Sequence, residues 1–542
     1  MLSTMADVPL TTTAIMRHAR EFNGERTVST AVGDGTVRSL TYTQVVEQAG
    51  RLANALRALG IGGDERIGTF MWNHAEHLVA YLGIPSMGAV LHTLNLRLAH
   101  EHISYIAGQA QDRVVIADLS LTAQLAAALP ELDTVHTVIA VGEGDLGPWE
   151  ASGKTVLRYH DLLAAHPAEF DWPELDERSA AAMCYTSGTT GNPKGVVYSH
   201  RSTYLHSMGV CTSNGLDIGS GDSVLPVVPM FHANAWGLPY AALMAGADLV
   251  MTDRFMDAAT LINLIETQRP TIAGAVPTIW NDVMNRLEAD PAHDISSLRR
   301  VACGGSAVPL SMMQAFEQRY GVAIQQLWGM TETSPMATTA RPLNGAADEQ
   351  YWAMRASQGR PICGVRARIV DEGGAVLPHD GVAVGELEVT GPWVTASYYQ
   401  DPDPDKFDDG WLRTGDVGRM DPHGFITLTD RAKDVIKSGG EWISSVDLEN
   451  ELIAHPAVRE AAVVAVPDDR WQERPLAAVV LADGARATPE DLREFLSDKV
   501  ARWWLPERWT FIEGIPRTSV GKYDKKLIRA RYADGLYQVI TV

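Results

Sequence analysis

A run of glycines, hydroxyl side chains and one lysine has the composition of a phosphate-binding loop. It covers residues 186–195 (TSGTTGNPKG) and follows the apolar residues 180–185 (AAAMCY), which are typical of a buried strand. Glycines let the backbone approach a ligand and turn its N–H groups toward an anion, while hydroxyls and a lysine add donors and charge. The spacing is not that of a Walker A loop, G-x-x-x-x-G-K, because Pro193 or Val196 stands where the second glycine would be.

A second group of chemistry-bearing residues follows downstream, at residues 327–333 (LWGMTET). A Thr-Glu pair beside a glycine is most often a turn or the start of a helix. Here it comes after residues 304–307 (GGSA), a turn at a predicted strand end, where doubly wound sheets bind ligands. The carboxylate of Glu332 could hold Mg²⁺, because this ion prefers hard oxygen ligands and keeps phosphate oxygens in its shell. The hydroxyls of Thr186 and Thr331 could bind the same ion or the phosphates.

Three shorter motifs complete the set, and each alone has an ordinary structural interpretation. Residues 411–416 (WLRTGD) could be a surface turn, residues 430–442 (DRAKDVIKSGGEW) a charged hinge, and residues 515–522 (IPRTSVGK) a solvated loop. A carboxylate such as Asp416 can accept hydrogen bonds from two neighbouring hydroxyls. A lysine such as Lys522 is a compact, mobile cation that could stabilise charge as a phosphoryl bond breaks.

Together, the five motifs resemble those of the adenylate-forming superfamily, which includes acyl-CoA synthetases, firefly-type luciferases and peptide-synthetase adenylation domains. They occur in the family's order between residues 180 and 525, roughly, and coincidence of all five is negligible. One position departs from the pattern, because Trp328 stands where the family's Y-G-x-T-E motif has tyrosine. An indole still stacks on adenine but lacks the phenolic oxygen, so adenine contacts through that oxygen are not expected.

The resemblance implies a role for each matching residue. Lys522 would be the catalytic lysine that touches the attacking carboxylate and the α-phosphate, and His232 and Glu332 would also be catalytic. Thr186 and Glu332 would hold the metal. Asp416 would bind both ribose hydroxyls, and Asp430 would be the pivot between two domains. The implied nucleotide-binding residues are Thr186, Ser187, Gly188, Thr189, Thr190, Lys194, Gly305, Ser306, Ala307, Gln326, Leu327, Trp328, Gly329, Thr331, Asp416, Arg431, Lys433, Lys437 and Trp442.

Residues 228–240 (VPMFHANAWGLPY) bear on the acid that is activated. Such an apolar stretch is ordinarily core, but it resembles the P-M-F-H-x-N-A-W stretch of bacterial medium- and long-chain fatty acyl-CoA synthetases. In those enzymes the aromatic at the position of Trp236 gates the acyl tunnel, and the histidine at the position of His232 lies beside the carboxylate. Ala233 and Trp236 are therefore the implied substrate residues. The resemblance predicts AMP-forming activation of a fatty acid through an acyl-adenylate, followed by formation of the CoA thioester.

Other substrates and other reactions stay open at this point. Residues 437–450 also resemble methylmercaptopropionate-CoA ligases, and Trp280 with the small residues Gly304, Gly305 and Ala307 could line a pocket for a short-chain or aromatic acid. A luciferase-like oxygenase would share every adenylation motif, since light emission begins from an acyl-adenylate. A peptide-synthetase adenylation domain would need an aspartate near residues 231–236 to hold an amino group, and none is present there.

The composition limits the partners. The 542 residues carry a formal net charge of -22, which disfavours sequence-independent binding to nucleic acid or anionic lipid. No apolar segment is long enough for a membrane span, and the N-terminus lacks the features of a secretory signal. Four widely spread cysteines fit a reducing cytoplasm better than a disulfide framework or a zinc site. The expected partners are ATP, Mg²⁺, coenzyme A and a carboxylic acid, and the resemblance implies a homodimer.

The surrounding sequence predicts the elements that position these motifs. In the N-terminal part, helical runs alternate with strand-like runs, as in residues 42–59, 66–71 and 114–117, and this rhythm is typical of parallel sheets covered by helices. Period-two alternation in residues 385–390 and 424–429 favours antiparallel strands. The expected fold is α/β. Residues 1–430 would form two doubly wound βα subdomains plus a distorted β-barrel, and residues 431–542 a small α+β domain, which the family resemblance implies is mobile.

Overall fold

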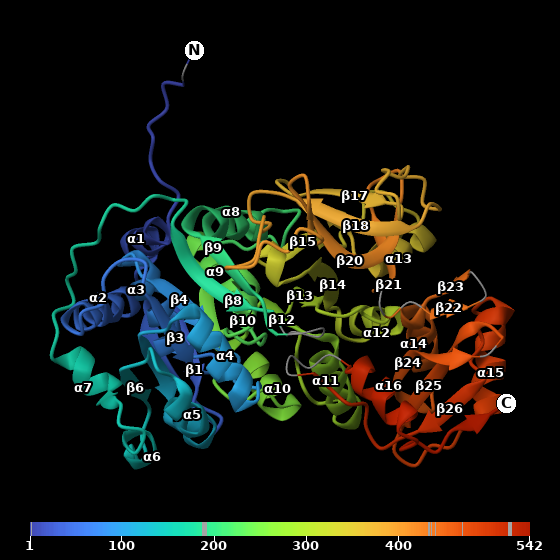
Figure 1. The fold of residues 1–542 in the computed structure, drawn as a ribbon. Coiled ribbons are helices and arrows are strands. Elements are labelled where there is room, and N and C mark those ends of the chain that lie inside the picture. The colour runs from blue at the N-terminus through green and yellow to red at the C-terminus, as the bar shows by residue number, and fades with distance from the viewer. Residues whose placement is uncertain are drawn as a thin grey trace.

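The computed structural model describes residues 1, 3–186, 192–431, 434, 436–438, 441–468, 470–518 and 523–542, with the backbone alone at residues 430, 431, 441 and 442. Its N-terminal part contains two large sheets, shown from blue to yellow in Figure 1, and the C-terminal part is drawn in red. Within the described residues, no helix is both long and apolar enough to cross a membrane.

The first sheet has seven strands in the order β7-β6-β5-β3-β4-β8-β9. Its neighbouring strands are parallel except for β8 and β9, which pair in antiparallel fashion on either side of the predicted phosphate loop. The strands are β3 (Arg66–Phe70), β4 (Val90–Thr93), β5 (Val114–Asp118), β6 (Thr137–Val141), β7 (Thr155–Arg158), β8 (Ala180–Tyr185) and β9 (Gly195–Ser199). The buried strand predicted at residues 180–185 is confirmed with the same bounds.

The second sheet has nine strands in the order β16-β15-β14-β13-β12-β10-β11-β1-β2, parallel at its centre and antiparallel at both edges. The strands are β1 (Thr27–Ala31), β2 (Val37–Thr41), β10 (Ser223–Pro226), β11 (Asp248–Met251), β12 (Ile272–Ala275), β13 (Arg300–Gly304), β14 (Ala323–Gly329), β15 (Met336–Thr339) and β16 (Arg360–Pro361). The chain therefore contributes β1 and β2 to this sheet before it builds the first one.

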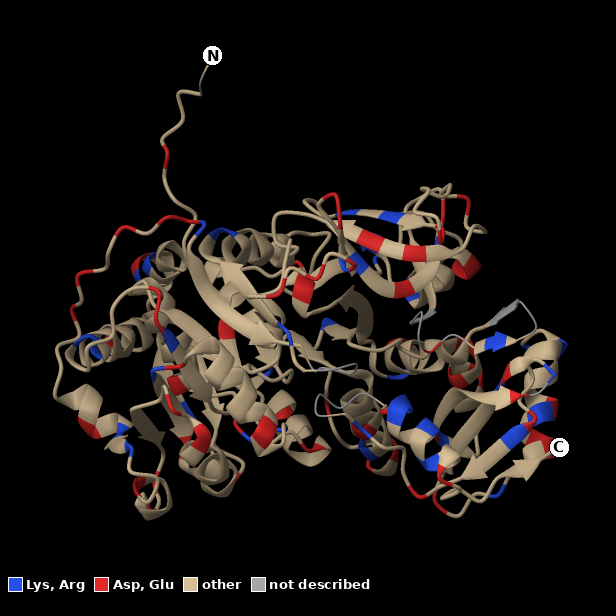
Figure 2. Cartoon of the chain, in the orientation of Figure 1, with Lys and Arg blue, Asp and Glu red and all other residues tan. Residues whose placement is uncertain are grey.

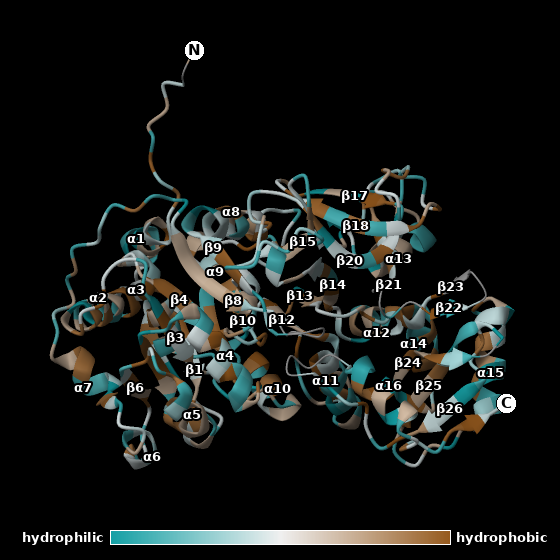
Figure 3. Ribbon diagram, in the orientation of Figure 1, coloured by the Kyte–Doolittle hydropathy of each residue, from teal (hydrophilic) through white to brown (hydrophobic). Residues whose placement is uncertain are grey.

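Helices cover the two sheets and fill the space between them (Figure 1). In the N-terminal part they are α1 (Thr12–Asn23), α2 (Tyr42–Ala58), α3 (Ala75–Ser86), α4 (His100–Ala110), α5 (Thr122–Ala128), α6 (Gly147–Glu150), α7 (Tyr159–Ala164), α8 (His200–Cys211), α9 (Leu238–Ala245), α10 (Ala258–Gln268), α11 (Pro277–Ala289), α12 (Leu310–Tyr320) and α13 (Asp348–Ala356). All twelve residues of α3 are buried. One large hydrophobic core contains residues of α3 and of both sheets, so this helix is packed between them (Figure 3).

Local sequence explains why α2 forms where it was predicted. The Thr41 hydroxyl accepts a hydrogen bond from the Gln44 backbone N–H at 3.2 Å, and the Gln44 side chain accepts one from the Thr41 backbone N–H at 2.8 Å. This reciprocal capping box satisfies donors that a helix start leaves unpaired. The helix ends just before Gly60, whose φ of 82° is a left-handed conformation that glycine adopts without steric cost.

The remaining strands form two smaller sheets. An antiparallel barrel-like sheet, yellow to orange in Figure 1, contains β17 (Arg366–Val370), β18 (Gly385–Thr390), β19 (Phe407–Asp408), β20 (Trp411–Met420) and β21 (Ile426–Arg431). The C-terminal sheet contains β22 (Ile436–Ser438), β23 (Glu441–Ile443), β24 (Val458–Asp468), β25 (Gln472–Leu481), β26 (Arg508–Phe511) and β27 (Ile540–Thr541), with helices α14 (Ser445–Ile453), α15 (Pro489–Ser497) and α16 (Lys525–Ala533). The predicted fold class is confirmed, while the boundary at residue 430 and the mobility of the C-terminal domain stay predictions.

Candidate active site

A cavity of about 440 Å³ opens where strands of both large sheets end. Its walls include the residues after β8, the ends of β13 and β14, and segments of the barrel-like sheet. The lining residues are Tyr105, Gln109, Thr186, Asn192, Pro193, Lys194, Leu216, His232, Ala233, Trp236, Leu238, Gly304, Gly305, Leu327, Trp328, Gly329, Met330, Thr331, Glu332, Pro335, Met336, Tyr398, Tyr399, Asp401, Asp403, Lys406 and Thr414. Ligand binding at the carboxyl ends of strands is the general arrangement in doubly wound sheets.

The phosphate loop begins and ends at the cavity wall. The Thr186 N–H donates to the Lys194 carbonyl at 2.9 Å, and the Lys194 N–H donates to the Thr186 hydroxyl at 3.1 Å, so the two ends of the loop are tied together. The predicted ligands Ser187, Gly188, Thr189 and Thr190 lie outside the described residues.

The side chain of Lys194 is held by two carboxylates in the loop between β18 and β19. Its Nζ lies 2.5 Å from Asp403 Oδ2 and 3.1 Å from Asp401 Oδ2, and 4.9 Å from the ring centroid of Tyr398. Burial alone would lower the pKa of Lys194, but these carboxylates outweigh it and raise the pKa, so the amine stays charged. A phosphate that binds here therefore has to compete with Asp401 and Asp403 for this cation.

Glu332, which lines the same cavity as Lys194, is buried, with 5% of its surface exposed. The Tyr398 hydroxyl donates to Glu332 Oε1 at 2.6 Å, and burial together with this carboxylate raises the pKa of Tyr398, which keeps the phenol protonated. One carboxylate oxygen is thus fixed by Tyr398. The neighbouring residue Thr331 is positioned through its carbonyl, which accepts a hydrogen bond from the Tyr198 hydroxyl at 2.7 Å.

Trp328 makes a contact that a tyrosine could not make in the same way. Its indole N–H donates to Asp416 Oδ2 at 2.8 Å, and both side chains are buried. Asp416 lies on β20, so this hydrogen bond ties the end of β14 to the barrel-like sheet. The departure from the family pattern therefore has a structural role, because the indole orients the carboxylate that is predicted to bind ribose.

Replacing Trp328 by phenylalanine is expected to raise the KM for ATP about tenfold, since a hydrogen bond to a charged group contributes about 1.5–3 kcal/mol. Phenylalanine keeps a ring in the cavity wall and removes the N–H that orients Asp416. The KM for ATP and for the acid can be measured in one pyrophosphate-release assay. An unchanged KM for ATP would contradict the orienting role.

Residues 228–240, the segment predicted to bind the acid, also reach the cavity. His232, Ala233 and Trp236 line it together with the apolar residues Leu216 and Leu238. Trp236 is 7% exposed. The sequence also indicated residues that could line a pocket for a short-chain or aromatic acid. Of these, Gly304 and Gly305 line the cavity, whereas Trp280 is buried in a separate core cluster.

Several predicted nucleotide ligands are not among the described residues that line the cavity, and their role stays a prediction. Ser306, Ala307 and Gln326 are absent from the described lining of the cavity. The Gln326 amide instead accepts from the Val308 N–H at 2.6 Å and donates to the Ser357 carbonyl at 2.7 Å. The described hydrogen bonds of the Gln326 amide therefore hold backbone groups of the protein in place. The exposed Lys437 lies on β22 of the C-terminal sheet.

Other predicted residues cannot be placed in the site. Lys433 and the catalytic candidate Lys522 lie outside the described residues, as do the side chains of Arg431 and Trp442. Conversely, sequence reasoning missed Tyr105, Gln109, Tyr398, Asp401 and Asp403, all of which line the cavity. These five are common surface residue types in ordinary loops and helices, so no local signal distinguishes them.

Glu332 and Thr186 are the two residues predicted to hold Mg²⁺. The described residues contain no group of three or more His, Cys, Asp or Glu side chains placed to hold a metal ion. Glu332 and Thr186 are hard oxygen donors that line one cavity, and Mg²⁺ is commonly held by one or two carboxylates plus substrate phosphates. The donor set fits that ion.

The comparisons with known proteins agree with this architecture. A family model described as "AMP-binding enzyme" matches residues 16–399, and one described as "AMP-binding enzyme C-terminal domain" matches residues 447–522. The chain therefore belongs to the AMP-binding, adenylate-forming family of enzymes. Within that family it is an acid–thiol ligase of the AMP-forming type.

Individual relatives are similar over nearly their whole length. The chain is 42% identical over 542 residues to a 3-methylmercaptopropionyl-CoA ligase of Ruegeria pomeroyi, covering 99% of this chain and 100% of the relative. It is 43% identical over 537 residues to a long-chain-fatty-acid–CoA ligase of Thermus thermophilus, covering 98% and 97%. A crystal structure of an anthranilate CoA ligase with anthranoyl-AMP superimposes with a TM-score of 0.88 at 26% identity, covering 98% and 99%.

Proposed function

We propose that this protein is an ATP-dependent acyl-CoA synthetase that activates a medium- to long-chain fatty acid. The observation that carries the proposal is the composition of the cavity, whose lining contains both polar and apolar side chains. Thr186, Lys194 and Glu332 supply the polar groups, and Leu216, Trp236, Leu238 and Met336 are among the apolar ones. Apolar lining suits an alkyl chain, since burying apolar surface is favourable.

The reaction proceeds in two half-reactions. A carboxylate oxygen of the acid attacks the α-phosphorus of ATP, the bond to pyrophosphate breaks, and an acyl-adenylate forms. The sulfur of coenzyme A then attacks the acyl carbonyl, the thiol proton is released, and AMP leaves. Catalysis of the first step depends on positioning and on cations, because negative charge spreads over the phosphoryl oxygens.

The chain's own residues would divide this work. Lys194 and Lys522 would supply the cations, Asp416 would hold the ribose in the orientation that Trp328 imposes, and His232 would lie beside the acid. Mg²⁺ on Glu332 and Thr186 would neutralise triphosphate charge. A homodimer and a cytoplasmic location stay predictions that rest on the resemblance and the composition.

A short-chain acid such as 3-methylmercaptopropionate is the second candidate. In support of it, a Cβ atom placed on Gly274 of β12 would lie 2.7 Å from Leu238 Cδ1 and 4.0 Å from Trp236 Cε3. Leu238 and Trp236 are therefore packed close to the sheet, which leaves little space for a long acyl chain beside Gly274. A short acid would need less space.

A carboxylate panel tests the proposal. ATP- and CoA-dependent AMP release would be measured with straight chains from C3 to C18, 3-methylmercaptopropionate, benzoate and cinnamate. Maximal kcat/KM between C8 and C16 is the expected result. Activity only on 3-methylmercaptopropionate or aromatic acids would favour the second candidate and overturn the fatty-acid assignment. Pyrophosphate release without any CoA thioester would indicate a different acceptor, and light emission with luciferin, ATP and oxygen would indicate a luciferase-like oxygenase.

A further inference from the structure

Asn73, a buried residue outside the cavity lining, binds the segment that leads to the acid side of the cavity. Its Nδ2 donates to the carbonyls of Pro226 and Val228, each at 2.9 Å, and its Oδ1 accepts from the Met230 N–H at 2.7 Å. Asn73 is 2% exposed, and it lies more than 150 residues from this segment in the sequence. One side chain thus fixes three backbone groups on residues 226–230.

Tyr81, which lies on α3, binds the same segment. Its hydroxyl donates to the Met230 carbonyl and lies 3.4 Å from Asn234 Oδ1. The Asn234 Oδ1 also accepts from the Cys184 thiol at 3.2 Å. Tyr81 lies on α3, which is buried along its whole length in the core shared by both sheets, and the buried Asn73 lies just before the start of this helix. Together the two residues form a rigid base for residues 226–234.

The segment held in this way continues into a strained turn. Four successive residues that are not glycine, Ala233–Trp236, have φ angles of 43°, 52°, 50° and 58°. For residues with a Cβ the left-handed region is disfavoured, and such conformations persist when surrounding structure enforces them. This turn carries Ala233 and Trp236 into the cavity. A conformation that is intrinsically unfavourable needs external hydrogen bonds to hold it in place.

We propose that Asn73 and Tyr81 are positioning residues for the acid-binding wall, and that they set acid affinity and chain-length preference through the His232–Trp236 turn. The inference rests on the proposed function, in which this turn contacts the acid. Neither residue is among those that line the cavity, and the residues predicted to bind the nucleotide lie on other segments. Loosening the base should therefore change how the enzyme binds the acid and leave ATP binding as it is.

Tyr81→Phe tests this inference against the matched control Tyr42→Phe. Tyr42 is also fully buried, and its hydroxyl donates to a backbone carbonyl, that of Ala247, which lies beyond α9 and away from the turn. Each variant loses one buried hydroxyl-to-carbonyl hydrogen bond, so both are expected to lose similar thermal stability. The KM values for acid and ATP would be measured by ATP–pyrophosphate exchange over the carboxylate panel.

The expected result is an increase in the acid KM of about fivefold for Tyr81→Phe, with a broader chain-length profile and a KM for ATP within about twofold of wild type. Tyr42→Phe should leave all three quantities unchanged. Asn73→Ser, which cannot make all three hydrogen bonds, should shift the acid KM in the same direction.

If Tyr81→Phe and Tyr42→Phe gave equal acid KM values and equal chain-length profiles, the inference would be overturned and the proposed function would stand. An equal rise in the acid and ATP KM values for Tyr81→Phe would also overturn it, because that pattern indicates general damage. A wild-type enzyme that accepts no carboxylate in the panel would overturn the proposed function, and the inference with it.

Discussion

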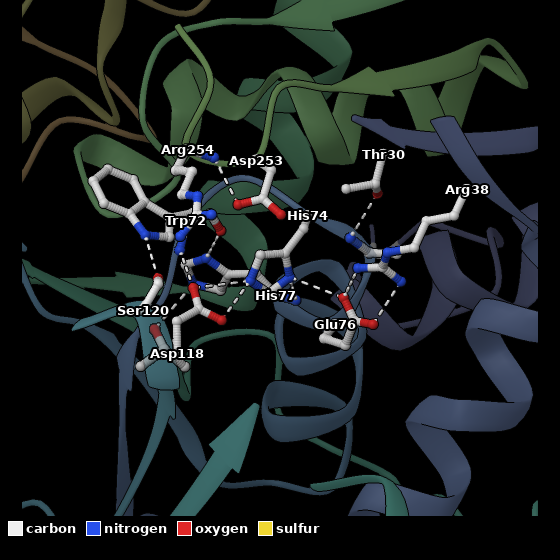
Figure 4. Close-up of polar contacts among 12 residues, drawn as sticks. Thr30, Arg38, Trp72, His74, Glu76, His77, Asp118, Ser120, Asp253 and Arg254 are labelled. Atoms are coloured by element: carbon white, nitrogen blue, oxygen red, sulfur yellow. Dashed lines mark hydrogen bonds and ion pairs between the residues drawn. The ribbon is translucent and has the colours of Figure 1, made fainter. Parts of the chain in front are cut away.

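Replacing Glu76 by glutamine is expected to lower the free energy of unfolding by about 3–5 kcal/mol, the range for removing one partner of a buried ion pair. The Glu76 carboxylate is 3% exposed, receives an Arg38 Nη1 hydrogen bond at 2.6 Å, and lies 3.0 Å from His74 Nδ1. His74 Nε2 in turn lies 3.0 Å from Asp118 (Figure 4). Most strands at the centre of the N-terminal part carry few charged residues (Figure 2). The side chains of His74 and Glu76 are only 3% and 4% exposed, so water does not readily replace either partner of that pair, whereas the Arg38 side chain is 42% exposed.

Chemical denaturation at neutral pH measures this loss, and Glu451→Gln is a suitable control. Glu451 pairs with Lys499 at 2.9 Å, but both side chains are more than one-third exposed, so its removal should change stability by at most about 1 kcal/mol. A loss for Glu76→Gln no larger than that of the control would contradict the prediction.

The stabilisation contributed by Glu76 and that contributed by His74 change with pH in opposite directions. Burial alone would raise the pKa of Glu76, but His74 and Arg38 outweigh it and lower the pKa well below its ordinary value of 4.5. Its stabilisation is therefore fully present above pH 4.5 and is lost as pH falls through the lower folded-state pKa. Burial alone would lower the pKa of His74, but Asp118 and Glu76 raise it well above 6.5. Its contribution is present below pH 6.5 and is lost as pH rises through the higher folded-state pKa.

Substitution of Gly329 by alanine is expected to reduce adenylation kcat/KM by about 100-fold or more, since displacing reacting groups by about 1 Å can have that effect. An alanine Cβ at this position would lie 1.7 Å from the Pro335 carbonyl oxygen, a backbone atom that cannot move independently. Gly329 ends β14 at a register shift and separates Trp328 from Thr331 and Glu332. The backbone shift needed to relieve the clash would therefore move all three.

ATP–pyrophosphate exchange with the best acid of the panel measures this effect. Gly221→Ala is the matched control, because a Cβ there meets nothing within 4 Å. Thermal unfolding of both variants separates loss of the site from loss of the fold. A folded Gly329→Ala protein with wild-type kcat/KM would contradict the prediction.

Much of the fold could be predicted from the sequence because the signals that define its elements are local. The strand at residues 180–185 and the helix starting at Tyr42 follow from apolar patterning and from a capping box within a few residues. Strand order could not be predicted in this way. The pairing of β1 with β11 joins residues 28 and 249, and no local pattern in either segment indicates that partner.

The chemistry of the site was also visible in the sequence, but its internal contacts were not. Glu332, Lys194 and Trp328 were identified from motif residues, and all three line the cavity. The hydrogen bond from Trp328 to Asp416 spans 88 residues, and that from Lys194 to Asp403 spans 209. Gln326 was expected to bind nucleotide; its amide hydrogen-bonds backbone groups of Val308 and Ser357, which the sequence did not indicate, and its nucleotide role stays a prediction.

The sequence by itself determined the class of reaction, because its five motifs resemble those of the adenylate-forming family in residue type and in order. Only the tertiary structure decided which carboxylates hold Lys194, what orients Asp416, and which buried residues support the acid-binding turn. Those contacts depend on how the two large sheets pack against α3 and against the barrel-like part of the chain, and packing brings together segments whose local sequences contain no information about one another.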